Sequence, residues 1–359
     1  MYYTRTLFLM FFVLTSISIF TAEKESKSAI TINAYSSSDN FLDAVPQSSD
    51  ARKIAEELTS KNSINISRDL RIYNPNHITS TSNFITLLDF ERQEFKFHLF
   101  NHSLEKTGAF GNSGRGPGEF KHPMSITRDV DENYLIADLR LNRISKFSDD
   151  GTHLDDTNTP FGINPFRFEG MGDSKNFVIL SLIGDKIFHI INEEGELLNS
   201  FLSIEGVSMN QKGFLLDGRI AADNDVIYHA GLRNDMLKAF TKDGELLFSR
   251  KVIAPLGLDI LNMEDQEVRS SPVGVLDLTI HENKILMLFG GQSDDNNRWY
   301  YLDIYDKNDG EYLYTYLMDR PTNRISIPEK DSSQWFFLGF DIDNTDERIL
   351  SSYDSLYYP

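Results

Sequence analysis

Residues 111–123, GNSGRGPGEFKHP, decide the fold, because a stretch so rich in glycine can be either a phosphate-binding loop or a bend between two sheets. A P-loop needs a Gly-Lys-Ser or Gly-Lys-Thr ending and a helix after it. Neither is present, since PMSITRD and NYLIADLRLNRISKF follow and read as strands. We therefore predict that residues 111–123 connect the outer strand of one sheet to the inner strand of the next, with glycines permitting the bend.

The strand pattern next to this stretch recurs along the chain. Each unit has an apolar strand, a polar bend and a second strand, and the units begin at Asn83, Asn133, Asn176, Asn224, Asn283 and Trp335. A third strand follows most units, after polar turns that close on Gly151, Gly195, Gly244 and Gly310, and a short apolar stretch precedes each unit. Four strands in a period of roughly 45–50 residues are typical of a propeller blade. We predict an all-β fold, a six-bladed β-propeller of four-stranded antiparallel blades.

The sixth blade lacks its outer strand, because the chain ends on the third strand of that blade, ILSSYDSLYYP. An open sheet edge invites pairing with other chains, so we expect an N-terminal strand to close the ring. SINIS (63–67) is the first candidate and SAITINAY (28–35) the second. In ARKIAEELTSK (51–61), Ile54 and Leu58 lie four residues apart, which predicts a short helix. The expected organisation is a linker with this helix over 23–61 and the propeller over 62–359.

The glycine-rich stretch and the strands after it carry a family resemblance. GxxGxGPGEFxxPxxI (111–126) followed by YLIADLRLNRISKF (134–147) resembles the NHL-type repeat, with Asp138, Asn142 and Arg143 where such repeats carry Asp, Asn and Arg. The chain is similar to TolB-like six-bladed propellers, which are abundant among exported proteins of Bacteroidetes-type bacteria. Later units match the motif only in part. The resemblance implies the fold, and it implies no particular activity.

Charge and composition exclude several classes of partner. The formal net charge is −19 and the chain has no cysteine, so we expect no nucleic-acid binding, no disulfide and no lipidated-cysteine anchor. Arg5 precedes an apolar run over 7–20, which is short for a membrane span and suits an export signal over 1–22. An uncleaved anchor is the alternative. We expect a secreted, periplasmic or cell-envelope protein that is monomeric and keeps no stable membrane span once the signal is removed.

We expect ligands on the face that carries the outer-to-inner connections and the middle hairpin loops, here called the linker-rich face, because loops on a rigid scaffold often bind partners. The predicted ligand-binding residues there are Arg115, His122, Arg140, Arg233, Arg298 and Trp299. Arginine binds carboxylates by paired hydrogen bonds, and tryptophan can stack on a sugar or peptide. The alternative is that these are solvated loop charges and that Trp299 lies in a strand.

Motifs for catalysis are sparse. The chain has no Gly-x-Ser-x-Gly and no His-Glu-x-x-His sequence, so we predict no catalytic residue, metal or cofactor. We expect a non-catalytic module that recognises a peptide, a protein or a glycan. The alternative is a metal-dependent hydrolase or lyase, similar to propeller lactonases, with its site in the central channel. For that alternative the inner strands offer His77, Asp129, Glu169, Asp217 and Asp277.

Overall fold

A computed structural model describes residues 43–91, 94–172, 174–205, 208–290, 300–328 and 333–355. Four features expected from the sequence lie outside these residues: the export signal over 1–22, the second candidate strand over 28–35, Arg298 and Trp299. No helix in the described part of the chain is long and apolar enough to cross a membrane.

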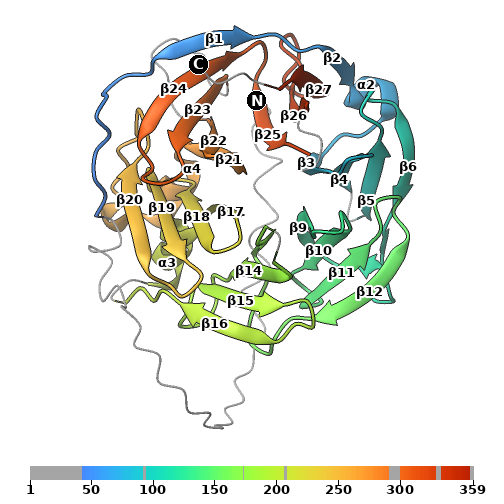
Figure 1. The fold of residues 1–359 in the computed structure, drawn as a ribbon, viewed down its shortest axis with the longest axis horizontal. Helices are drawn as coiled ribbons and strands as arrows, with labels where there is room; N and C mark the ends of the chain where they lie inside the picture. The colour runs from blue at the N-terminus through green and yellow to red at the C-terminus, as the bar shows by residue number, and fades with distance from the viewer. Residues whose placement is uncertain are drawn as a thin grey trace. The chain divides into compact units, whose positions relative to one another are not determined.

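Each of the first three blades is a four-stranded antiparallel meander that runs from the channel to the rim (Figure 1). The first consists of β3 (Pro75–Ser80), β4 (Ile85–Glu91), β5 (Glu94–Phe100) and β6 (Lys106–Phe110). The second consists of β9 (Pro123–Arg128), β10 (Tyr134–Asp138), β11 (Arg143–Phe147) and β12 (His153–Asn158). The third consists of β13 (Arg167–Gly170), β14 (Asn176–Leu180), β15 (Phe188–Asn192) and β16 (Leu197–Phe201).

The other three blades repeat the meander, and the N-terminal segment adds strands to two of them. The fourth consists of β17 (Gly218–Ala222), β18 (Val226–Gly231), β19 (Met236–Thr241) and β20 (Leu246–Lys251). The fifth consists of β21 (Val275–His281), β22 (Lys284–Phe289), β23 (Tyr301–Asp306), β24 (Tyr312–Met318) and β1 (Ile54–Leu58). The sixth consists of β25 (Thr322–Ser326), β26 (Gln334–Phe340), β27 (Arg348–Asp354) and β2 (Asn62–Asn65).

The six blades form a closed ring, as the repeats predict. The inner strands β3, β9, β13, β17, β21 and β25 contact one another in cyclic order, and β25 returns to β3. Ring closure by an N-terminal strand is confirmed, because β2 pairs antiparallel with β27 from Asn62 opposite Ser352 to Asn65 opposite Ile349. Short helices lie in the connections: α2 (Ile66–Leu70), α3 (Met209–Leu216), η1 (Ile260–Asn262) and α4 (Asp265–Ser270).

The short helix expected within residues 51–61 is wrong. Residues Ile54–Leu58 form strand β1, which pairs parallel with β24. A spacing of four residues suits both one helical turn and one face of a strand, so Ile54 and Leu58 cannot distinguish them. The open edge of β24 decides the outcome, because the backbone amide of Thr315 donates to Lys53 O at 2.9 Å.

Candidate functional site

Of the predicted ligand-binding residues that the structure describes, three lie in the connection that leads into the second blade and in its middle hairpin loop. Arg115 and Arg140 are exposed, and His122 is partly exposed between them in sequence. Arg115 lies in the glycine-rich connection, which folds into a short parallel pair, β7 (Asn112–Ser113) and β8 (Glu119–Phe120). This connection is a bend in the propeller, as predicted, since β9 and no helix follows it.

One buried carboxylate holds two loops of the linker-rich face together. Asp138, at the end of β10, is fully buried. Its Oδ2 accepts the backbone amides of Lys121 and His122, and its Oδ1 accepts those of Arg140 and Leu141 at 2.9 Å each. The end of the glycine-rich connection and the middle hairpin loop therefore meet at one side chain, which brings Lys121, His122 and Arg140 to the same place.

Two cationic side chains fix the rest of the glycine-rich connection. Arg143 donates to the carbonyl oxygens of Gly116 and Glu119, and it pairs with Asp156 at 3.3 Å. Lys96 Nζ donates to Gly111 O at 2.9 Å. Gly111 has a φ of +76°, and an added Cβ would lie 2.7 Å from the ring of Phe97, so this position requires glycine. The Asp and Arg of the NHL-type motif thus shape the loops of the second blade.

His122 lies against two aromatic rings of the first blade. Its imidazole meets Phe90 and Phe95 edge-on, at centroid distances of 6.0 and 6.4 Å. Burial is the main cause that lowers the pKa of His122 below its ordinary value, and the positive charge of Arg140 lowers it further. The negative charge of Asp138 acts to raise the pKa. A neutral imidazole, two aromatic rings and an exposed guanidinium are a combination suited to an amphipathic ligand.

Arg233 lies elsewhere, on the middle loop of the fourth blade. Its Nε is buried and has no hydrogen-bond partner within the described chain. Burial lowers the pKa of Arg233, and the nearby charge of Asp217 partly offsets this. The structure therefore does not unite all the predicted residues, and Arg233 forms a second basic position on the linker-rich face.

A second candidate site lies in the central channel, in a cavity of about 510 Å³. Of the predicted ligand-binding residues that the structure describes, none lines it. Five of the inner strands contribute a polar, an apolar and a polar residue in succession, and β17 departs from this pattern with Ala221 as its third residue. The apolar members are buried in the hydrophobic clusters between blades: Ile78, Ile126, Phe168, Ile220, Leu278 and Ile325. Because side chains alternate along a strand, the polar members form two layers around the channel.

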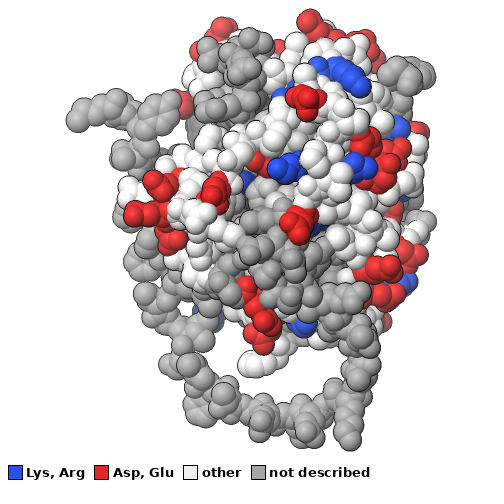
Figure 2. Space-filling model, turned by 90° about the vertical axis from the view of Figure 1, so that its left-hand side faces the viewer, with Lys and Arg blue, Asp and Glu red and all other residues white. Residues whose placement is uncertain are grey.

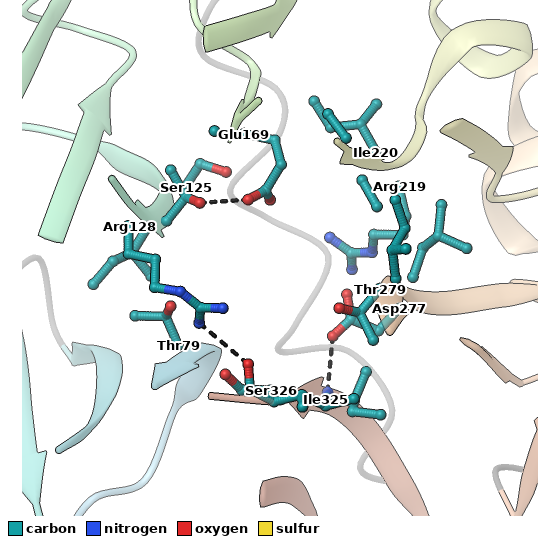
Figure 3. A pocket seen from close by; sticks show the side chains of 18 of the residues that line it. Thr79, Ser125, Arg128, Glu169, Arg219, Ile220, Asp277, Thr279, Ile325 and Ser326 are labelled. Atoms are coloured by element: carbon teal, nitrogen blue, oxygen red, sulfur yellow. Dashed lines mark hydrogen bonds between the residues drawn. The ribbon is translucent and has the colours of Figure 1, made fainter. Parts of the chain in front are cut away.

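The first layer, nearer the linker-rich face, is rich in arginine. It consists of His77, Ser125, Arg167, Arg219, Asp277 and Arg324. The second layer is rich in hydroxyl groups and consists of Thr79, Thr127, Glu169, Ala221, Thr279 and Ser326. Figure 3 shows Glu169 and Arg219 reaching into the cavity from different blades, and Asp277 bonded to the amide of Ile325 at 2.9 Å.

The guanidinium groups of the first layer are held by backbone carbonyls of the neighbouring blades. Arg167 Nε donates to Gly218 O at 3.1 Å, and its Nη2 pairs with Asp217 at 2.8 Å. Arg219 Nε donates to Leu276 O at 2.7 Å, and Arg324 Nη1 donates to the same oxygen at 3.0 Å. Two positive charges therefore converge on one carbonyl oxygen.

The ionisable groups of the channel are strongly affected by this arrangement. Burial and the charges of Arg324, Arg219 and Arg167 hold the pKa of His77 well below its usual range, so His77 is neutral. Burial raises the pKa of Glu169 to about 7, although the hydrogen bond that this carboxyl accepts from Thr127 Oγ1 acts to lower the pKa. Burial also lowers the pKa values of Arg219 and Arg324.

The residues offered for a metal site are brought only partly together. His77, Asp129, Glu169 and Asp277 line the cavity, and Asp217 is engaged by Arg167. Asp129 pairs with Lys146 at 2.7 Å. Within the described residues, no group of three or more His, Cys, Asp or Glu side chains is placed to hold a metal ion. The donor set here is cationic, which suits an anion better than a divalent cation.

Comparison with known proteins supports the fold. The sequence model of the family described as TolB-like 6-blade propeller-like matches residues 54–330. No curated protein sequence matches the chain.

Solved structures resemble the chain in fold. A Bacteroides fragilis protein described as exported is 14% identical, covers 87% of this chain and 99% of its own, and aligns with a TM-score of 0.54. A luciferin-regenerating enzyme is 10% identical, covers 81% of this chain and 95% of its own, and aligns with a TM-score of 0.50. At these identities the likeness extends to the fold alone.

Proposed function

Because this chain belongs to the TolB-like six-bladed propeller family, we propose that it is an exported binding protein that recognises an acidic peptide, protein or glycan on its linker-rich face. The observation that carries this proposal is the clamp at Asp138, which gathers Lys121, His122 and Arg140 from two loops. A fold so similar in an exported Bacteroides fragilis protein supports the location.

The charge of the molecule gives this cluster its significance. Asp and Glu side chains outnumber Lys and Arg by 54 to 35, and Figure 2 shows both signs interspersed on one side of the molecule. Against that background, Lys121 and Arg140 are exposed cations, and Arg115 is exposed on the connection that leads to them. A partner with carboxylates or sulfates would be attracted to these loops and repelled elsewhere.

The proposal is tested by charge reversal at the two exposed arginines. The variant Arg115→Glu/Arg140→Glu and the wild type are measured by biolayer interferometry against polygalacturonate and poly-glutamate, at two salt concentrations. We expect the wild type to bind one of these polyanions and the variant to lose about tenfold or more in affinity, with a weaker salt dependence.

The matched control is Lys106→Glu, which makes the same kind of charge change at an exposed position of the outer strand β6. It should bind as the wild type does. A loss of binding free energy in the control that is half as large as in the double variant, or larger, would show that only net charge matters, and the proposed face would be rejected.

A further inference from the structure

The arginine layer of the channel carries more positive charge than the protein neutralises. Three guanidinium groups face one carboxylate within the layer, that of Asp277. Among the described residues, one carboxylate outside the layer, that of Asp217, lies within ion-pair distance of these arginines. It pairs with Arg167. A buried charge without a counter-charge is costly, so this layer is incomplete as the protein alone supplies it.

Arg219 is the clearest case of an unmatched group. Its Nε is bonded to Leu276 O, whereas its two terminal nitrogens have no hydrogen-bond partner within the described residues. Figure 3 shows its guanidinium directed into the cavity. Burial and the charges of Arg324 and Arg167 lower the pKa of Arg219, which means that these cations destabilise one another. An anion placed between them would remove that penalty.

The geometry favours a planar oxyanion. Because Arg219 and Arg324 share the carbonyl oxygen of Leu276, their guanidinium planes are held close together by the backbone of the fifth blade. Nε and Nη1 of Arg324 already donate to backbone oxygens, so this residue offers Nη2 to a ligand. Arg219 is bonded at Nε and presents its two terminal nitrogens as paired N–H donors, which match a carboxylate.

The second layer specifies the rest of the ligand. The hydroxyl groups of Thr79, Thr127, Thr279 and Ser326, with the carboxyl of Glu169, line the cavity next to the arginines. Hydroxyl side chains donate and accept hydrogen bonds, and therefore complement the hydroxyl groups of a ligand. The volume of about 510 Å³ is in the range of sites for small molecules.

We propose that the channel binds a small hydroxylated carboxylate, whose carboxylate group contacts Arg219 and Arg324 and whose hydroxyl groups contact the second layer. This site is separate from the loops of the linker-rich face, since none of Arg115, His122 and Arg140 lines the cavity. A small ligand and a larger partner can thus be recognised by different parts of the same ring.

The test uses glucuronate as the probe, glucose at matched ionic strength as the uncharged control, and inorganic phosphate as an alternative anion. Binding is measured by calorimetry and by the thermal unfolding midpoint. We expect millimolar glucuronate to raise the Tm of the wild type by about 2 °C or more, and glucose to leave it unchanged. No response to glucuronate, or a response to phosphate alone, would overturn the assignment of the ligand class.

Variants separate a receptor role from a purely structural one. Arg219→Met removes the charge and keeps most of the apolar volume, so the Tm without ligand should stay level or rise, and the glucuronate response should disappear. Arg219→Lys keeps the charge without the paired donors and should bind about tenfold more weakly than the wild type. Lys106→Met, at an exposed position of β6 away from the cavity, should keep the full response.

Two results would identify Arg219 as a mere link between blades. One is a Tm without ligand that falls by several degrees in Arg219→Met while glucuronate still binds. The other is wild-type affinity in that variant. Because these assays use no polyanion and no residue of the linker-rich face as a reporter, their failure would leave the proposed binding function untouched.

Discussion

A single carboxylate, Asp138, organises an exposed face from within the protein. It accepts four backbone amides, two from each of the loops that it joins. Removing it in Asp138→Ala leaves these donors unpaired and should lower the free energy of unfolding by about 3 kcal/mol, measured by chemical denaturation. Asp155→Ala, an exposed position on β12, is the control and should change it by no more than about 0.5 kcal/mol. Equal stabilities of the two variants would contradict the clamp.

His229 makes stability depend on pH. Its side chain is 2% exposed, its Nε2 lies 3.0 Å from Leu216 O, and burial lowers its pKa to about 4. The unfolded chain titrates near 6.5 and so binds an additional proton between these values. The contribution of His229 is therefore complete above pH 6.5 and is lost as the pH falls towards 4, by up to about 3 kcal/mol.

The measurement is a series of denaturant titrations between pH 7 and pH 4 for the wild type and His229→Gln. The variant should show a flatter loss of stability over this interval, whatever its stability at pH 7. Parallel curves for the two proteins would mean that His229 does not titrate differently in the folded and unfolded chains.

The arginine layer marks where residue-level prediction from the sequence stopped. The inner strands show an arginine in PFRFEG, GRIAA and TNRIS, each next to an apolar residue, so the signal was present. The sequence pattern assigns carboxylates and a histidine to the channel and places the candidate arginines on loops. The register of the inner strands determines which polar positions of different blades lie in the same layer. The residue types of one strand do not reveal that register.

At the scale of elements, strand β1 shows why local spacing is insufficient. Its stability comes from tertiary contacts: Arg52, two residues before β1, bonds both oxygens of the fully buried Asp303 at 2.9 Å each. The guanidinium also lies over the rings of Phe289 and Tyr301, at 4.5 and 4.4 Å. These partners are more than two hundred residues away in the chain, so no local pattern could predict them.

Arg52→Ala should therefore detach the N-terminal segment from the fifth blade. It leaves Asp303 buried without its cation, at a cost of about 3–5 kcal/mol. We expect faster amide hydrogen exchange in residues 53–58 and a lower unfolding free energy. Glu57→Ala, an exposed position on β1, is the control and should exchange as the wild type does. Unchanged exchange in Arg52→Ala would show that backbone pairing with β24 suffices.

At the scale of the whole molecule, the number of blades, their meander and their closure could be predicted from the sequence. The turns that close on Gly151, Gly195, Gly244 and Gly310 all have positive φ values, which is why glycine recurs there. Such a fold can be predicted from its repeats, because every blade has the same alternation of apolar and polar residues and the same turn. The channel is different, since it arises from the six blades together and its chemistry varies from blade to blade.

Ring closure by β2 gives the last prediction. The strand joins the first and last parts of the chain, pairing Asn62–Asn65 with the outer edge of β27, and Asn65 caps the helix that follows. Deleting residues 60–68 removes the strand and exposes the apolar edge of the sixth blade to other molecules, so the variant should no longer be a soluble monomer. Size-exclusion chromatography with light scattering measures this directly. A chain that begins at residue 43 keeps both N-terminal strands and serves as the control. Should the deletion variant remain monomeric with an unchanged Tm, blade-to-blade packing would be enough to close the ring without β2.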